Sequence, residues 1–247
     1  MHRSWVPKEW VDNFIYNSSA TLPKEVYQRF FSIVRIKPSE IVSVFDGHGR
    51  EITGELIEDK ISGSCHFSKA SLTVSDKPMP PLILMQSALQ EAKLEDTIQR
   101  GTEIGVDEFI VFNAERSEPF CYAKFVKKQG RFMRIAQDAC RQSGRTFMPS
   151  IVQADSLSQA LKQSLGWFGV FGSLADNTLL STTMQKAAAQ SVPIAVLVGP
   201  EGGLSTAEHE LARTHNFQGV RWAPYTLRSE LAGVFAMAIV QASLGRG

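Results

Sequence analysis

The residues that first suggest chemistry lie in LVGPEGGLSTAEHELA, residues 197–212, where three glycines and a proline separate an apolar run from a polar segment. The apolar run, 194–198, predicts a strand that is buried on both faces, as in a parallel sheet. Ser205 followed by Glu208 predicts a capping box at the start of a helix. The positions with bare backbone are Gly199, Gly202 and Gly203. Such backbone can adopt positive φ and let another group approach. The stretch is either an ordinary turn or a ligand loop at the carboxyl end of a strand, where open α/β sheets bind ligands.

A second polar cluster, TLRSELA at 226–232, joins the predicted last strand to the last helix. Arg228 and Glu230 stand at the mouth of an apolar helix, for which Ser229 or Thr226 would suffice as a cap. The two charges form either an exposed ion pair or part of one crevice with the glycine loop, since both loops follow strands at the same edge of the sheet. The patterns G-x-G-x-x-G and G-x-x-x-x-G-K-[ST] do not occur in the sequence, so no familiar phosphate loop is indicated.

Residues 124–145 predict a helix with a basic stripe over an apolar base. Five cations fall within about 80° of one another on a helical wheel, with Lys124 close by. They are Lys127, Arg131, Arg134, Arg141 and Arg145. The stripe is either a solvated helix face or a surface that follows phosphates along a nucleic acid. Only one acid, Asp138, lies among these bases, which favours the phosphate-binding interpretation.

The clearest boundary in the chain is DKPMPP at 76–81, where three prolines in six residues predict an extended linker. Residues 1–75 predict a small β-rich domain with a hairpin around 46–49. Residues 82–247 alternate strands with helices, which predicts a parallel sheet with helices on its faces. The predicted strands are 82–88, 108–115, 167–175, 194–198 and 219–224, and the predicted helices are 89–104, 126–143, 156–165, 178–190 and 205–214.

The last predicted helix, SELAGVFAMAIVQASLG, carries so little charge that we expect burial on more than one side. Its broad apolar arc comprises Leu231, Val234, Phe235, Ala238, Ile239 and Ala242. The pattern fits a core helix of a monomer and, equally, a dimer interface across a twofold axis.

The composition narrows the class of protein. Lys and Arg number 26 against 25 Asp and Glu, so a nucleic-acid surface would have to come from clustering of charge. The three cysteines, Cys65, Cys121 and Cys140, lie far apart, which indicates neither a zinc knuckle nor a disulfide framework and fits a reducing, cytosolic compartment. No apolar run approaches membrane-spanning length. We therefore expect neither a metal centre nor a membrane partner.

Four motifs in order resemble the ribosomal RNA small subunit methyltransferase E family, which belongs to the SPOUT class of knotted methyltransferases. They are RGTEIGVDEFIVFNAERS, CRQSGRTFMPSI, LVGPEGGLSTAEHELA and LRSELA, and they span most of residues 82–245. VRIKPSEIVSVFDGHGREITGEL resembles the family's N-terminal PUA-like β-barrel. The resemblance implies an α/β fold with a trefoil-knotted parallel-sheet domain at 82–247, a barrel at 1–75 and a homodimer. The sequence departs from the family pattern: no histidine pair occurs at 28–35, Arg141 stands for the usual Glu, and Leu231 stands for the usual Thr.

The resemblance further implies methyl transfer from S-adenosylmethionine to N3 of one uridine, position 1498, in 16S ribosomal RNA of the small subunit. Carried over to this sequence, the cofactor loops are Phe171–Ala175, Leu197–Gly203 and Tyr225–Arg228. The expected cofactor contacts are Phe171, Gly172, Leu174, Leu197, Val198, Gly199, Pro200, Glu201, Gly202, Gly203, Tyr225, Leu227 and Arg228. The expected RNA contacts are Arg29, Arg35, Lys127, Arg131, Arg134, Arg141 and Arg145.

Methylation at N3 requires loss of the N3 proton and stabilisation of the anion on O2 and O4. We expect Arg145 and Arg228 to stabilise that charge, with Glu230 as the first candidate base and Glu201 as the second. Two alternatives remain open at this point. One is a SPOUT methyltransferase that acts on another nucleotide, and the other is a non-catalytic RNA-binding factor in ribosome assembly.

Overall fold

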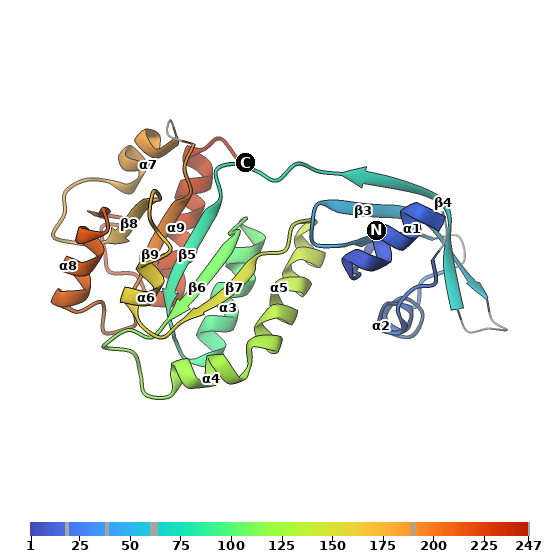
Figure 1. Ribbon diagram of the computed structural model, residues 1–247, viewed down its shortest axis with the longest axis horizontal. Coiled ribbons are helices and arrows are strands. Elements are labelled where there is room, and N and C mark those ends of the chain that lie inside the picture. The colour runs from blue at the N-terminus through green and yellow to red at the C-terminus, as the bar shows by residue number, and fades with distance from the viewer. Residues whose placement is uncertain (18–19, 38–39, 60–63, 189–190, 247) are drawn as a thin grey trace. The chain divides into compact units, whose positions relative to one another are not determined.

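A computed structural model describes residues 1–17, 20–37, 40–59, 64–188 and 191–246. By internal contacts the chain divides into two units (Figure 1). Unit 1 comprises Met1–Lys77 and Cys140–Met148, and unit 2 comprises Pro78–Ala139 and Pro149–Gly247. The change after Lys77 falls inside the predicted linker. The grouping of Cys140–Met148 with the N-terminal part of the chain differs from the predicted boundaries.

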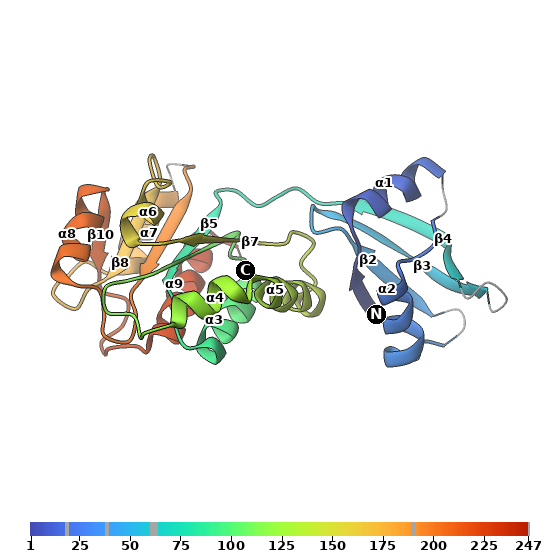
Figure 2. The ribbon, with the colours of Figure 1, turned by 60° about the horizontal axis from the view of Figure 1, so that its bottom comes forward.

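Unit 1 is built on a four-stranded sheet in the order β1-β2-β3-β4 (Figure 2). β1 runs parallel to β2, and the other two pairs are antiparallel. The predicted hairpin is confirmed, because Val44 lies opposite Ile52 across its two strands. The sheet of the described strands is mixed and open, so the closed PUA-like barrel is not confirmed. The elements are β1 (His2–Trp5), α1 (Lys8–Asn17), α2 (Lys24–Gln28), the π-helix η1 (Arg29–Val34), β2 (Ile41–Phe45), β3 (Arg50–Asp59) and β4 (Ser64–Val74).

Arg3 contributes to the contacts that group residues 140–148 with unit 1. Its Nε donates to Oε1 of Glu51 at 2.8 Å, and its Nη1 donates to the carbonyl oxygen of Cys140 at 2.9 Å. Its Nη2 also reaches the carbonyl oxygen of Arg145 at 3.5 Å. A cation at the carboxyl end of a helix is favourable, because the last carbonyls of the helix lack intrahelical donors.

Unit 2 contains a six-stranded parallel sheet in the order β10-β8-β9-β5-β6-β7. The α/β class and the parallel sheet are confirmed. The strand β7 was not predicted, and β10 begins two residues before the predicted 219–224 and ends at Val220. Residues 189–190 of the predicted helix 178–190 lie outside the described part of the chain. The elements are β5 (Leu82–Ser87), α3 (Glu91–Glu103), β6 (Glu108–Phe112), α4 (Cys121–Lys127), α5 (Gln129–Ser143), β7 (Ser150–Ala154), α6 (Leu157–Leu161), β8 (Phe168–Gly172), α7 (Leu180–Ala188), β9 (Ile194–Val198), α8 (Thr206–Thr214), β10 (Phe217–Val220) and α9 (Ser229–Ser243).

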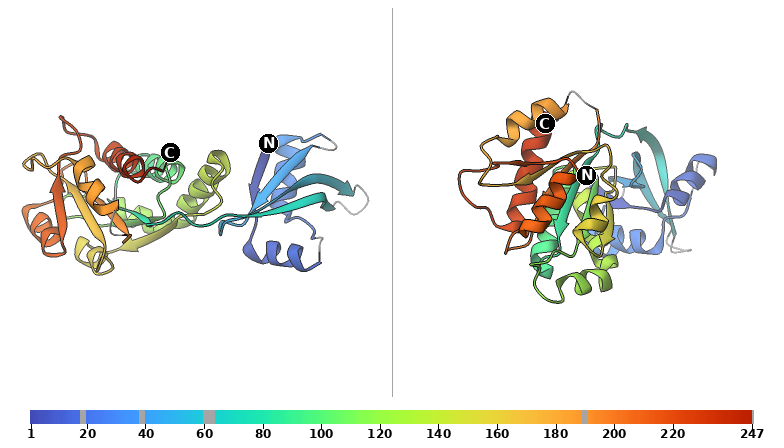
Figure 3. Two further views of the ribbon diagram at one scale, coloured as in Figure 1. Left: turned by 90° about the horizontal axis from the view of Figure 1, so that it is seen from above. Right: turned by 60° about the vertical axis from the view of Figure 1, so that its left-hand side comes forward.

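Apolar clusters cover both faces of this sheet. On β5, Leu82 and Leu84 face one cluster with residues of α3, α7 and α9, and Ile83 and Met85 face another with residues of α6 and α8. Figure 3 shows these two sets of helices on opposite sides of the strands. Burial on both faces is the physical reason for the unbroken apolar strands in the sequence. Within the described residues, every helix is too short or too polar to cross a bilayer.

The segment predicted as one basic helix is two helices, α4 and α5. The break falls at Lys128, whose φ of −114° and ψ of 19° lie outside the helical range. The prediction of a continuous wheel over 124–145 was therefore wrong, because a wheel assumes unbroken helical dihedrals. The predicted apolar base is confirmed, with Phe125, Phe132 and Ala136 buried in unit 2.

Candidate active site

A cavity of about 500 Å³ opens in unit 2 at the carboxyl ends of β8, β9 and β10. Three loops line it, and they follow these three strands. The glycine loop and the Arg228–Glu230 segment face the same cavity, as their positions after parallel strands predicted. Of the expected cofactor contacts, all but Gly202 line the cavity. Of the expected catalytic residues, Arg228, Glu230 and Glu201 line it, and Arg145 does not.

The glycine loop is a tight turn directly after β9. The N–H of Gly203 donates to the carbonyl of Pro200 at 2.9 Å, and Gly203 has a φ of +68°, a value that side chains rarely tolerate. A Cβ on Gly199 would lie 2.8 Å from the backbone nitrogen of Leu204. A Cβ on Gly202 would instead lie 3.4 Å from Cβ of Arg116. The prediction that Gly202 faces the ligand therefore finds no support in the geometry, because this glycine faces the loop after β6.

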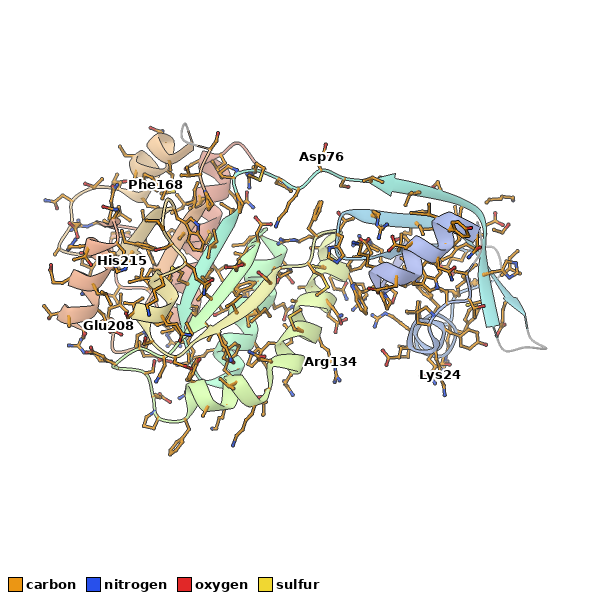
Figure 4. The ribbon with its side chains drawn as sticks, viewed as in Figure 1. Lys24, Asp76, Arg134, Phe168, Glu208 and His215 are labelled. Carbon is orange, nitrogen blue, oxygen red and sulfur yellow. The ribbon has the colours of Figure 1, made fainter. Side chains whose placement is uncertain are left out.

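The predicted capping box at the start of α8 is confirmed. The N–H of Glu208 donates to Oγ of Ser205 at 3.1 Å, and the N–H of Ser205 donates to Oε2 of Glu208 at 2.8 Å. The other carboxylate oxygen of Glu208, a residue labelled in Figure 4, accepts from the N–H of Glu115 at 3.0 Å. The buried carboxylate of Glu208 thereby accepts from two backbone N–H groups, and the hydroxyl of Ser205 accepts from a third, which fixes where the glycine loop ends.

A hydroxyl group connects the glycine loop to α9. Oγ of Ser229 donates to the carbonyl oxygen of Gly199 at 2.7 Å. The expectation that Ser229 or Thr226 caps α9 was wrong, because the N-cap residue is Arg228 and no side chain caps the helix there. The first turn of α9 thus points into the cavity with its backbone N–H groups uncapped by a side chain.

Two cations, Lys93 and Arg228, and two anions, Glu201 and Glu230, line the cavity. Nζ of Lys93, in α3, lies 2.6 Å from Oε1 of Glu201. Burial raises the pKa of Glu201, but the hydrogen bond from Lys93, a backbone hydrogen bond and the charge of Lys93 together outweigh burial and lower the pKa below its usual value. The same hydrogen bond raises the pKa of Lys93. Both groups are charged at neutral pH, so Glu201 is a poor proton acceptor.

Glu230 is placed differently from Glu201. Its Oε2 is buried and has no hydrogen-bond partner among the described residues. Nε1 of Trp222, which also lines the cavity, is another buried polar atom without such a partner. Buried polar atoms in proteins are nearly always hydrogen-bonded, so unsatisfied ones at a cavity wall indicate a site for a polar ligand.

Aromatic rings, those of Phe171 and His209, also line the cavity. The ring of Phe171 lies 5.2 Å from the ring of His209, and the guanidinium of Arg213 lies 5.0 Å from the centre of the Phe171 ring. Burial lowers the pKa of His209, which keeps its imidazole neutral at physiological pH.

The basic segment 124–145 includes cations that pair with acids of another helix, which the sequence did not indicate. Arg131 pairs with Glu95 through Nε, and its Nη2 lies 3.1 Å from Oε2 of the same residue. Nζ of Lys128 lies 2.7 Å from Oε2 of Glu91. The argument from local acid content was wrong at this point, because the acids come from α3. Lys127 and Arg134, the latter labelled in Figure 4, are exposed, and no ion pair joins either of them to a carboxylate of the described residues.

The remaining predicted cations lie in unit 1. Nε of Arg145 donates to the carbonyl of Phe147 at 2.5 Å. Arg141 is half-buried near the end of α5. Arg29 is half-buried in η1, and Arg35 is exposed with a φ of 58°. All four stay predictions as RNA contacts.

The last helix, α9, is a core helix on one side only. Ala232, Ala236 and Val240 are buried against the rest of unit 2, whereas Leu231 is 50% exposed and Phe235 is 36% exposed. Ala238 and Ala242 are also exposed, at the same helical spacing. The outward face of α9 is therefore apolar.

Sequence reasoning missed three polar contributors to the cavity, namely Lys93, His209 and Trp222. Lys93 lies in the first turn of a helix that follows a buried strand, which was a signal for a residue near a binding site. Its partner Glu201 lies 108 residues away in the sequence, so the pair itself could not be predicted. Over the described ranges, His, Cys, Asp and Glu form no group of three or more that could hold a metal ion.

Comparison with known proteins fits this geometry. A family model described as an RNA methyltransferase domain matches residues 75–241. The Aquifex aeolicus protein named ribosomal RNA small subunit methyltransferase E is 30% identical over 215 residues, which cover 86% of this chain and 90% of that protein. The Bacillus subtilis protein of that name is 30% identical over 184 residues, which cover 71% of this chain and 72% of that protein.

The fold has a solved counterpart. The Neisseria gonorrhoeae ribosomal RNA small subunit methyltransferase E bound to S-adenosyl methionine matches with a TM-score of 0.82 at 24% identity, and the match covers 98% of this chain and 97% of that one. Fold, cavity and family model together define an RNA methyltransferase domain. Within that class, the chain belongs to the ribosomal RNA small subunit methyltransferase E family.

Proposed function

We propose that the protein transfers a methyl group from S-adenosylmethionine to N3 of a uridine in 16S ribosomal RNA, with position 1498 as the target. The observation that carries the proposal is the cavity at the carboxyl ends of β8, β9 and β10, where Glu230, Arg228 and the glycine loop meet. Membership of the family and the names of the relatives support the substrate.

The residues of the cavity fit S-adenosylmethionine. A volume of about 500 Å³ lies in the usual range for a cofactor site. The unpartnered Nε1 of Trp222 suits an acceptor group of the ligand. When bound there, the cofactor supplies an electrophilic methyl group. The chain's part is to hold the target base in line with that group and to exclude water.

Glu230 and Arg228 have different proposed roles in the removal of the uracil N3 proton. The uracil N3 proton must leave before or during transfer, and Glu230 is the proposed acceptor because its Oε2 makes no competing hydrogen bond among the described residues. Glu201 is the weaker candidate, because Lys93 stabilises its ionised form. Arg228, exposed at the mouth of the cavity, is proposed to stabilise the charge that develops on the uracil oxygens.

We further propose the assembly that the resemblance implies. The outward apolar face of α9, with Leu231, Phe235, Ala238 and Ala242, supports a homodimer through this helix. The three loops that converge on one cavity are consistent with a SPOUT trefoil knot. Unit 1 is proposed as a PUA-like RNA-binding domain in which Arg29, Arg35, Arg141 and Arg145 contact RNA. We propose the cytoplasm as the place of the reaction, because the proposed substrate is ribosomal.

The test is nucleoside mass spectrometry of 16S ribosomal RNA from cells with and without the gene, combined with transfer of labelled methyl by the purified protein. We expect 3-methyluridine to disappear on deletion and to return with the wild-type gene. Complementation with Glu230→Gln should restore little of it. Unchanged 3-methyluridine after deletion would disprove the proposed target.

A further inference from the structure

Phe120 combines two unfavourable features in one residue. Its side chain is 77% exposed, and its backbone has a φ of 67° and a ψ of −6°, in the left-handed region. Bulky side chains rarely adopt this conformation, and strained residues of this kind cluster at binding and catalytic sites. Neither apolar burial nor backbone preference explains why a phenylalanine stands here.

The surrounding backbone enforces this conformation. The N–H of Cys121 donates to the carbonyl of Glu118 at 3.3 Å, and the N–H of Lys124 donates to the carbonyl of Phe120 at 2.9 Å. Cys121 and Phe125, on the inner side of α4, are buried. The ring of Phe120 is therefore presented to solvent by a fixed turn and not by a free loop.

Two cations lie on the outer side of the same helix. Lys124 and Lys127 lie three residues apart in α4, the spacing that places two side chains on one side of a helix. Both are exposed, and neither forms an ion pair with a described carboxylate. Glu91, an acid of the neighbouring α3, already pairs with Lys128.

The loop that carries Phe120 contacts two segments that contribute residues to the cavity. In the loop between β6 and α4, Nη1 of Arg116 donates to the carbonyl oxygens of Gly202 and Leu204 at 3.2 and 3.4 Å. Glu118 accepts from Nε2 of Gln90 at 2.9 Å, just before α3, which contributes Lys93 to the cavity.

We propose that Phe120 is a stacking platform for a base of the RNA substrate, with Lys124 and Lys127 beside the adjoining phosphates. The proposal rests on the proposed function, because it takes a single-stranded RNA as the occupant. A base that enters a catalytic cavity leaves its own stack, and its neighbours lose a stacking partner. An exposed aromatic ring with adjacent cations replaces that partner and holds the backbone at the same time.

The experiment measures binding of a fluorescent transcript of the 16S ribosomal RNA segment around uridine 1498. Phe120→Ala should weaken binding by roughly 5- to 150-fold, the change that corresponds to about 1–3 kcal/mol for one base–aromatic stack. Phe120→Trp should bind about as well as wild type. Lys127→Gln should lower the log–log salt slope by about one unit, whereas Phe120→Ala should leave the slope unchanged.

Matched controls lie elsewhere in unit 2. Leu165 is an apolar side chain that is 93% exposed in the turn before β8, and Lys162 is an exposed lysine after α6. Leu165→Ala and Lys162→Gln should leave RNA binding unchanged. Phe120→Asn should lower affinity like Phe120→Ala yet raise the melting temperature, because Asn tolerates the left-handed conformation.

The outcomes separate the two proposals. If wild type methylates the transcript and Phe120→Ala binds it as wild type does, only the stacking role is wrong. If affinity depends on Phe120 but no methyl is transferred, only the proposed function is wrong. A change in sedimentation mass without a change in RNA affinity would assign Phe120 to a protein contact and overturn the stacking role.

Discussion

Comparing Gly199→Ala with Gly202→Ala should show which side of the glycine loop contacts the cofactor. The Cβ added in Gly199→Ala would lie 2.8 Å from the backbone nitrogen of Leu204 and 3.0 Å from its Cγ, so the loop must open. That movement would disturb the 2.7 Å hydrogen bond from Ser229 to the carbonyl of Gly199. Overpacking of this kind costs about 1–3 kcal/mol. Gly202→Ala is the matched control, because its Cβ would make an ordinary 3.4 Å contact with Arg116.

The effect on the cofactor can be read as a thermal shift. S-adenosylmethionine at 100 times its Kd should stabilise wild type by about 2.7 kcal/mol. For a chain of this size that is a rise in Tm of about 5 to 11 °C. Each tenfold loss of affinity in a variant removes about 1.4 kcal/mol of that gain. Gly199→Ala should lose at least half of the rise, and Gly202→Ala should keep it.

Scanning fluorimetry with and without S-adenosylmethionine gives the rise, and calorimetric titration gives the Kd without reference to stability. The two measurements separate a less stable loop from a lost ligand contact. An equal cofactor-dependent rise in wild type and Gly199→Ala would refute the placement of the ligand against this loop. Loss of the rise in Gly202→Ala alone would show that the opposite side of the loop binds the ligand.

Three further outcomes follow from the contacts. Because Lys93 lowers the pKa of Glu201, the pair stabilises the fold above the usual Glu pKa of 4.5 and loses this effect as pH falls through the lowered value. When the pH falls from 7 to about 3, the denaturant midpoint of Lys93→Gln should therefore fall less than the midpoint of wild type. If α9 forms the dimer, Phe235→Arg should halve the mass measured by sedimentation and keep a cooperative melting transition. Ala236→Arg should instead unfold the protein, because Ala236 is fully buried. Arg131→Gln should leave the salt slope of RNA binding unchanged, since Arg131 is paired with acids of α3; a slope lower by about one unit would contradict that assignment.

Local features of this protein could be predicted from the sequence. The capping box at Ser205 and Glu208 depends on residues three apart, and the turn at Gly203 depends on one φ that glycine favours. The buried strands followed from unbroken apolar runs. From the parallel order of strands it also followed that the glycine loop and Arg228 open at one edge of the sheet.

Features that join distant segments could not be predicted from the sequence. The wheel over 124–145 gave the right apolar base but missed the break at Lys128, because one residue's dihedrals depend on packing around it. It also left Arg131 free, whereas its acids lie about one helix and one strand earlier in the chain. The same limit applies to Gly202, whose direction depends on the loop after β6.

The sequence by itself determined which residues are suited to chemistry, because glycine, arginine and glutamate carry their backbone freedom and charge wherever they lie. The tertiary structure decided which of those groups pair with one another and which do not. Lys93 binds Glu201 across 108 positions of the chain, and Oε2 of Glu230 is left without a described partner. Proton affinity depends on neighbouring charge and burial at a few ångströms, and only the folded chain sets those distances.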